Sequence, residues 1–277
     1  MDDLDNLGYS ILCDIAEHPS GEWSCIAFND MVYVLDPAWT ILREFEGTAD
    51  INMICSEDRI FVSENTHAQF AVMDAGAVRS LDVNGVRIAE HISEDGDLGP
   101  DVPAFGYAEL ALGPDHLLFV VGFHADDEEA VVVALDTRDL RIRFSFGRDV
   151  FQSMVYGMAV GGEELYVGEE DGWVHAFSLT GQHLRKMEIN VRPQEIRYHD
   201  GRLYVLEKAS NSIGVPVGMG KRIIVLTPEG EELQIFTNPD DEGEPLPLHH
   251  IFIVGGRLIV CGRAGSGEDR FFALKGL

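Results

Sequence analysis

The chain has 277 residues, of which 45% are hydrophobic, and it carries a formal net charge of −28 at pH 7. No apolar run approaches the roughly 18 to 20 residues that cross a bilayer as a helix, so the composition predicts no membrane insertion. A surface this acidic repels phosphate backbones, which argues against nucleic acid as a ligand.

The N-terminal residues "MDDLDNLGYS" contain three Asp and no Lys or Arg, unlike the basic start of a secretory signal peptide. We therefore expect an intracellular, cytoplasmic protein. The four cysteines are far apart and lie within apolar runs, which predicts buried thiols and argues against disulfides or a paired metal site. They are Cys13, Cys25, Cys55 and Cys261.

Alternating apolar and polar runs recur along the chain. In chain order they are "MVYVLDPAW", "AVRSLDVNG", "VVVALDTRD", "WVHAFSLTG", "RIIVLTPEG" and "RFFALKGL", and most end in a polar turn. A period of roughly 40 to 50 residues is typical of propellers and other repeat arrays. The intervals are 46, 54, 42, 49 and 48 residues when the repeats are aligned on Leu35, Leu81, Leu135, Phe177, Leu226 and Leu274.

Each of these runs is preceded by an apolar hairpin pattern, as in "INMICSEDRIFV" and "MAVGGEELYV", and most are followed by a further strand pattern, as in "TILREFEG". Each repeat therefore predicts a four-stranded antiparallel meander. One such sheet cannot bury both of its faces alone, so the sheets must stack about an axis. We expect an all-β fold, a six-bladed β-propeller of four-stranded antiparallel blades. A two-sheet sandwich is the alternative, but it does not explain the repeated strand order.

We expect residues 1–277 to form a single β-propeller domain. The last repeat lacks an outer strand, and the first lacks a clear inner strand before "WSCIAFNDMVYVLD". The segment "GYSILCDIAE" is expected to supply one of them, and pairing of this N-terminal strand with the final blade would close the ring. The expected blades are 8–47, 50–92, 107–147, 155–189, 193–237 and 248–277.

The stretch "YGMAVGGEELYVGEEDGWVHAFSLTG" resembles an NHL-type repeat, with an apolar hairpin containing "LYV", a polar connection and an apolar strand that ends in an acidic or Gly turn. The similarity to NHL-repeat-like six-bladed propellers covers most of residues 23–277. In this chain Gly168 and Leu206 stand where that family often has Asp. The resemblance implies a propeller that binds another protein or peptide.

The long connections are expected on one face of the propeller, and they are rich in Asp and Glu. Examples are "SEDGDLGPDVPAFGY", "FHADDEEA", "EEDGW" and "NPDDEGEPLPLHH". Like charges gathered on one rim create a negative field that attracts a basic partner. The alternative is that the acidic loops are simply solvated and keep the protein soluble. Neighbouring aromatic residues favour binding, because aromatics anchor interfaces.

The sequence therefore predicts an interaction module with an acidic loop face at the mouth of a propeller, rather than an enzyme. Its expected partner is a basic protein or peptide, and it acts as a monomer or as part of a larger assembly. We expect no cofactor, no catalytic residue and no metal ligand. The predicted binding residues are Asp97, Phe105, Phe123, Asp126, Asp127, Phe151, Tyr156, Glu170, Asp171, Trp173, Asp240, Asp241 and His249.

The alternative function is a divalent-metal-dependent hydrolase of the gluconolactonase type, with Ca²⁺ bound by acidic loop residues. "HPSGEW" faintly resembles the opening motif of that family, but its residue order differs and Tyr156 stands where the family has Asn. His249 and His250 are adjacent in an expected strand, so only one of them can face a channel. We expect a structural role for both rather than metal binding.

Overall fold

The computed structural model describes strands and turns over much of the chain. The described residues contain strands β1 to β23, and no helix among them could cross a membrane. They belong to two compact units, Met1–Asp149 (unit 1) and Val150–Leu277 (unit 2). The residues described are 12–28, 31–46, 51–64, 76–94, 96–97, 106–124, 129–208, 220, 222–237, 247–263 and 269–273.

Unit 1 contains three four-stranded antiparallel sheets, and in each sheet the strands are ordered as they follow in the chain. The first sheet consists of β1 (Leu12–Glu17), β2 (Ser24–Phe28), β3 (Met31–Leu35) and β4 (Ile41–Glu46). The second consists of β5 (Ile51–Cys55), β6 (Ile60–Glu64), β7 (Ala77–Leu81) and β8 (Arg87–Ile92). The third consists of β9 (Gly106–Leu112), β10 (Leu117–His124), β11 (Glu129–Asp136) and β12 (Ile142–Phe146).

Unit 2 contains two four-stranded sheets and one three-stranded sheet, again in chain order. The first consists of β13 (Val155–Gly161), β14 (Glu164–Glu169), β15 (Trp173–Ser178) and β16 (His183–Glu188). The second consists of β17 (Pro193–His199), β18 (Arg202–Glu207), β19 (Arg222–Leu226) and β20 (Glu232–Thr237). The third consists of β21 (Leu248–Val254), β22 (Arg257–Arg263) and β23 (Asp269–Ala273).

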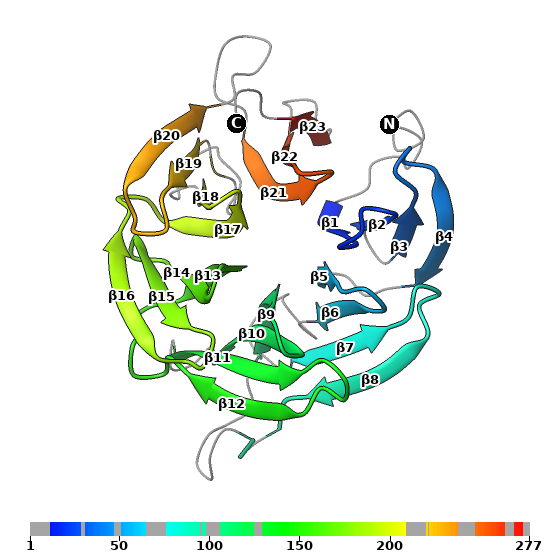
Figure 1. The fold of residues 1–277 in the computed structure, drawn as a ribbon, viewed down its shortest axis with the longest axis horizontal. Coiled ribbons are helices and arrows are strands. Elements are labelled where there is room, and N and C mark those ends of the chain that lie inside the picture. The colour runs from blue at the N-terminus through cyan, green and yellow to red at the C-terminus, as the bar shows by residue number, and fades with distance from the viewer. Residues whose placement is uncertain are drawn as a thin grey trace. The chain divides into compact units, whose positions relative to one another are not determined.

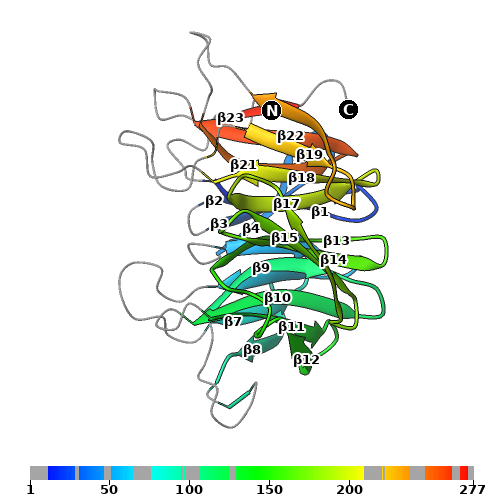
Figure 2. The same ribbon diagram turned by 90° about the vertical axis from the view of Figure 1, so that its left-hand side faces the viewer.

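Within each unit the first strands of successive sheets lie side by side. β1 contacts β5 and β5 contacts β9 in unit 1, while β13 contacts β17 and β17 contacts β21 in unit 2 (Figures 1 and 2). Apolar side chains fill the space between neighbouring sheets, such as Val34 and Met53 in unit 1 and Tyr166 and Ile196 in unit 2. Fourth strands are largely exposed, as in β4 and β20. Each sheet therefore packs as a propeller blade, because its burial depends on the next sheet.

The expectation of six four-stranded blades is wrong in its count, although the four-stranded antiparallel blade itself is confirmed. The described residues form five four-stranded sheets, and the sheet of β21, β22 and β23 has three strands. The physical reason is strand pairing, because β1 pairs with β2 in the first sheet and does not add a fourth strand to the sheet of β21, β22 and β23.

The N-terminal strand β1 completes the first sheet. It pairs antiparallel with β2, with Ile15 opposite Ile26 and Glu17 opposite Ser24. Of the two positions open to the segment "GYSILCDIAE", β1 therefore takes the inner strand of the first blade. It is tied to the next blade by Asp14, whose Oδ2 accepts a hydrogen bond of 2.6 Å from the amide of Met53 on β5.

Most of the first strands contain a β-bulge near their start. In unit 2 the register shifts between Val155 and Met158 in β13, between Pro193 and Glu195 in β17, and between Leu248 and His250 in β21. A bulge bends the strand and redirects a side chain. As a result, three residues take corresponding places at the same end of unit 2, namely Tyr156, Gln194 and His249.

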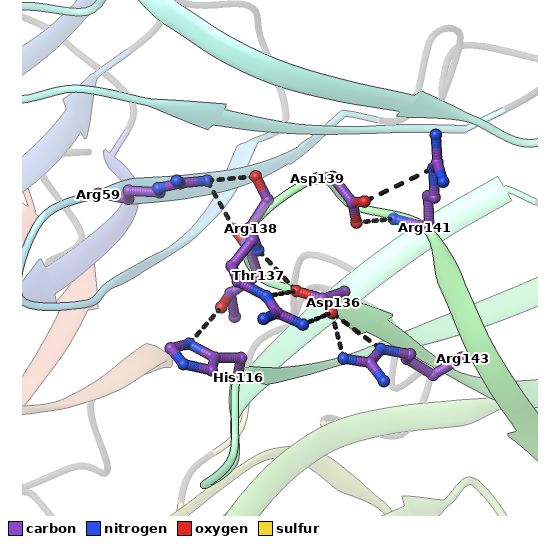
Figure 3. A network of polar contacts seen from close by, with 8 residues as sticks. All are labelled: Arg59, His116, Asp136, Thr137, Arg138, Asp139, Arg141 and Arg143. Atoms are coloured by element: carbon purple, nitrogen blue, oxygen red, sulfur yellow. Dashed lines mark hydrogen bonds and ion pairs between the residues drawn. The ribbon is translucent and has the colours of Figure 1, made fainter.

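A buried carboxylate, that of Asp136, lies at the end of β11 in the third sheet of unit 1. Asp136 accepts hydrogen bonds from Arg138 Nε at 2.8 Å and from Arg143 Nε at 2.9 Å (Figure 3). Arg59, in the turn between β5 and β6 of the second sheet, donates to the carbonyl oxygens of Thr137 at 2.7 Å and Arg138 at 3.0 Å. The network thus connects two neighbouring blades of unit 1.

Asp136→Asn is expected to lower the free energy of unfolding by about 2 kcal/mol, because a neutral amide replaces a carboxylate that accepts charge-assisted hydrogen bonds. Hydrogen bonds from Arg138 are the largest cause that holds the pKa of Asp136 far below its usual value. The stabilisation is therefore present above the unfolded-state pKa of about 3.9 and is lost as the pH falls below it. Urea unfolding at neutral and acidic pH measures both effects.

Asp139→Asn is the matched control, since Asp139 is half exposed and lies 3.5 Å from Arg141. Exposed ion pairs of this kind contribute roughly 0 to 1 kcal/mol. An equal loss of stability in the two variants, or an unchanged acid sensitivity of Asp136→Asn, would contradict the assignment.

Candidate binding site at the strand ends of unit 2

The predicted binding residues of unit 2 gather at one end of its strands. Neighbouring strands run in opposite directions, so the starts of β13, β17 and β21 lie at the same end as the ends of β14 and β18. The described predicted residues on or beside these ends are Phe151, Tyr156, Glu170, Asp171, Trp173 and His249.

The side chain of Lys208 lies between two of these predicted residues. Its Nζ is 3.6 Å from the centroid of the Tyr156 ring and 3.3 Å from Oε1 of Glu170. Arg192 approaches the same carboxylate oxygen at 3.7 Å. An ammonium group over an aromatic face and beside a carboxylate is stabilised by both the ring quadrupole and the charge. We call Tyr156 and Glu170 the lysine-binding position.

A second lysine makes similar contacts in the neighbouring strands. Lys186 Nζ lies 4.3 Å from the centroid of the Trp173 ring and 3.3 Å from Oε2 of Glu169. The carboxylate here is fully buried and has further partners. Its Oε1 accepts backbone hydrogen bonds from Gln152 and Ser153, so it stays satisfied without the lysine.

His175 extends this buried network into the sheet. Its Nε2 lies 2.9 Å from Glu169 Oε2, and its Nδ1 lies 3.2 Å from Nε2 of His183. Burial lowers the pKa of His175, against the attraction of Glu169. Burial would raise the pKa of Glu169, but the amides of Gln152 and Ser153 and the imidazole of His175 hold it below its usual value. Both pKa shifts are consistent with a neutral His175 that donates a hydrogen bond to a charged Glu169. We assign this buried pair a structural role.

A second buried acid connects the last two sheets of unit 2. Glu195 on β17 accepts a hydrogen bond of 2.8 Å from the amide of Ile251 on β21, and its other oxygen pairs with Nδ1 of His250. Gln194 donates to the carbonyl oxygen of His249 at 3.0 Å. The described contacts therefore give His250 a structural role, while they leave the predicted binding role of His249 open.

The remaining predicted residues lie elsewhere. In unit 1, Asp97 accepts a hydrogen bond of 2.9 Å from the amide of Glu94 and approaches His91 at 3.9 Å, which is typical of a turn. Phe123 lies in β10, but its side chain is not among those described. The predictions that fall outside the described residues concern Phe105, Asp126, Asp127, Asp240 and Asp241.

The sequence-based prediction of this site missed its basic side chains. Lys186, Lys208 and Arg192 each contact an acid at this end of unit 2, and Arg222 lies with its Nε 2.9 Å from Glu207 Oε2. The chain contains only four lysines, and neither Lys186 nor Lys208 stands next to an aromatic residue in the sequence, so no local signal indicated these contacts. Within the described part of unit 2, these carboxylates therefore do not form an uncompensated negative surface.

Two further features of the described residues concern metal binding and thiol chemistry. No group of three or more His, Cys, Asp or Glu side chains among them is arranged to bind a metal ion. Among the described residues no disulfide joins Cys25, Cys55 and Cys261, and all three are buried. A hydrogen bond with Cys25, together with burial, raises the pKa of the Cys55 thiol well above its usual value, which disfavours the reactive thiolate.

Comparison with solved structures shows a β-propeller fold. The chain is similar to BamB from Moraxella catarrhalis, with a TM-score of 0.56 and 14% identity over 95% of this chain and 86% of that one. It is also similar to the WD40 β-propeller domain of Doa1, with a TM-score of 0.62 and 11% identity over 96% of this chain and 79% of that one.

At these identities the likeness extends to the fold alone. The sequence matches no protein-family model, so the resemblance to NHL repeats stays a prediction. No curated protein matches it either.

Proposed function

We propose that the chain is a propeller module that binds a basic protein or peptide at the strand ends of unit 2. One observation carries the proposal: Tyr156, Glu170 and Trp173 lie at this end, and their aromatic rings, with adjacent carboxylates, bind ammonium groups of the chain's own lysines. The same chemistry suits lysine side chains of a partner.

The connections of unit 2 supply the negative charge that this function requires. The segment "DDEGE", residues 240–244, contains four acids and no base, and in the sequence it stands between the end of β20 and the start of β21. The described carboxylates Glu169, Glu170 and Glu207 are paired with bases, so we assign the attraction of the partner to this connection. A field of this kind speeds encounter and weakens with salt.

The quadruple variant D240N/D241N/E242Q/E244Q is expected to bind a fluorescein-labelled octalysine peptide about tenfold more weakly, since four rim charges contribute roughly 0.2 to 1 kcal/mol each. The loss should be largest at low salt and should shrink as salt is added. Fluorescence anisotropy titrations at both salt concentrations measure it.

A variant with the same change in charge serves as the control. E163Q/D200N/E229Q/E231Q removes four exposed acids from turns at the opposite end of unit 2. Equal weakening in both variants would show an effect of net charge alone and would contradict the proposed surface. A melting temperature that rises with Ca²⁺ at constant ionic strength would favour the hydrolase alternative instead.

A further inference from the structure

We infer that Lys208 is an internal competitor, which occupies the lysine-binding position of Tyr156 and Glu170 until a lysine of the partner replaces it. The inference rests on the proposed function and names the chemistry of recognition: a primary ammonium group on a flexible side chain. Lys208 then lowers the affinity by occupying the contacts that the partner needs, in addition to the repulsion that its charge exerts on a basic partner.

The position is fixed independently of the Lys208 side chain. The backbone amide of Glu170 donates to the carbonyl oxygen of Met154 at 2.8 Å, and the amide of Lys208 donates to the carbonyl oxygen of Arg192 at 2.7 Å. Tyr156 lies in the bulged start of β13. Removal of the ammonium group therefore leaves in place the backbone that carries the ring and the carboxylate, and a site on a fixed backbone binds with a lower entropic cost.

Glu170 differs from its neighbour Glu169 in what it contacts. Glu169 is fully buried and accepts two backbone hydrogen bonds in addition to its contacts with His175 and Lys186. The side chain of Glu170 is 25% exposed, and the contacts described for its carboxylate are with Lys208 and Arg192. Of these two carboxylates, only that of Glu170 has a lysine partner that another ammonium group can replace without a backbone hydrogen bond to compensate.

Exchange of one lysine for another preserves the energetics of the site. The incoming ammonium group takes over the contacts with the ring and the carboxylate, so Glu170 is not left without a counter-charge. Lys208, whose side chain is 15% exposed in the occupied position, moves into water, where a solvated ammonium group is stable. Every binding event then includes the free energy of displacing Lys208, which lowers the affinity for the partner.

The test is the variant Lys208→Met, which keeps a long side chain and removes the competing charge. We expect it to bind octalysine about tenfold more tightly than the unmodified chain, equivalent to ~1.4 kcal/mol. In the double variant K208M/Y156L the aromatic face is also lost, and the affinity should return close to the original value. Anisotropy titrations at constant salt compare all three proteins.

Arg202→Met controls for net charge, because it removes one exposed positive charge at the start of β18, at the opposite end of unit 2. A gain in R202M as large as that in K208M, or a gain that survives in K208M/Y156L, would overturn the inference and leave the proposed function intact. Absence of octalysine binding in every variant would contradict the proposed function, and the inference with it.

A second measurement needs no peptide. Lys208→Ala leaves space for a free cation, so n-butylammonium chloride is expected to raise the melting temperature of K208A relative to an equal concentration of sodium chloride. The unmodified chain, whose position is occupied, should show no such rise. Equal responses of the two proteins would contradict the idea that Lys208 occupies an exchangeable ammonium site.

Discussion

Glu195→Ala is expected to lower the free energy of unfolding by about 3 kcal/mol, near the lower end of the range for breaking a buried ion pair. Glu195 is buried and connects β17 to β21 through the amide of Ile251 and the imidazole of His250. The variant leaves the buried amide of Ile251 without its acceptor, which lowers stability. The loss of stability is limited because His250 is partly exposed and can be solvated. Urea unfolding followed by the fluorescence of the three tryptophans measures it.

Glu207→Ala provides the comparison, because its partner Arg222 is 41% exposed and can be solvated. An exposed pair contributes roughly 0 to 1 kcal/mol, so a similar loss in the two variants would refute the special role of Glu195.

The loss of stability at acidic pH independently tests the contribution of Glu195. Burial would raise the pKa of its carboxyl, but the charges of His250 and Arg197 outweigh burial and lower it. Its stabilisation is therefore present above the unfolded-state pKa of about 4.3 and is lost as the pH falls below that value. The Glu195→Ala variant should show a smaller loss of stability between neutral and acidic pH.

Gly157→Ala is expected to destabilise the protein by about 2 to 4 kcal/mol, the sum of backbone strain and overpacking. Gly157 has a φ of +73°, and a Cβ there would lie 2.7 Å from the amide nitrogen of Ile196 and 2.8 Å from the backbone of Glu195. It lies within the bulge of β13, next to the backbone of Glu195 and Ile196 in β17. Thermal and urea unfolding both report the loss.

Gly201→Ala separates the two contributions. Gly201 has the same φ of +73°, but nothing lies within 4 Å of the position of a Cβ. It should therefore show the strain alone, about 1 kcal/mol. If Gly157→Ala costs no more than Gly201→Ala, the close approach of β13 and β17 is not a constraint on the fold.

Local patterns explain why the strand order was predictable and why the blade count was not. Alternation has a period of two residues and is read within a single strand, so "MVYVL" and "WVHAFS" indicate β3 and β15 directly. Which strand completes a sheet depends on pairing across the chain. Such pairing determines that β1 joins β2 and that the sheet of β21 to β23 has three strands.

The candidate site shows the same division. Tyr156, Glu170 and Trp173 could be chosen from the sequence, because acidic and aromatic residues in turns are a local signal. Their occupation by Lys208 and Lys186 was not predicted, since Lys208 is 38 residues from Glu170 and on a different blade. The sequence indicated an open acidic surface at positions where the folded chain carries its own counter-charges.

The amino-acid sequence by itself determined the β class and the repeating four-strand unit, because these follow from residue periodicity and composition. Only the tertiary structure decided the bulges that redirect Tyr156, Gln194 and His249, and the acids that link neighbouring first strands. Those features arise where two blades meet. A contact between strands that lie some 40 to 60 residues apart, such as Asp14 with Met53 or Glu195 with Ile251, has no local pattern in the sequence to reveal it.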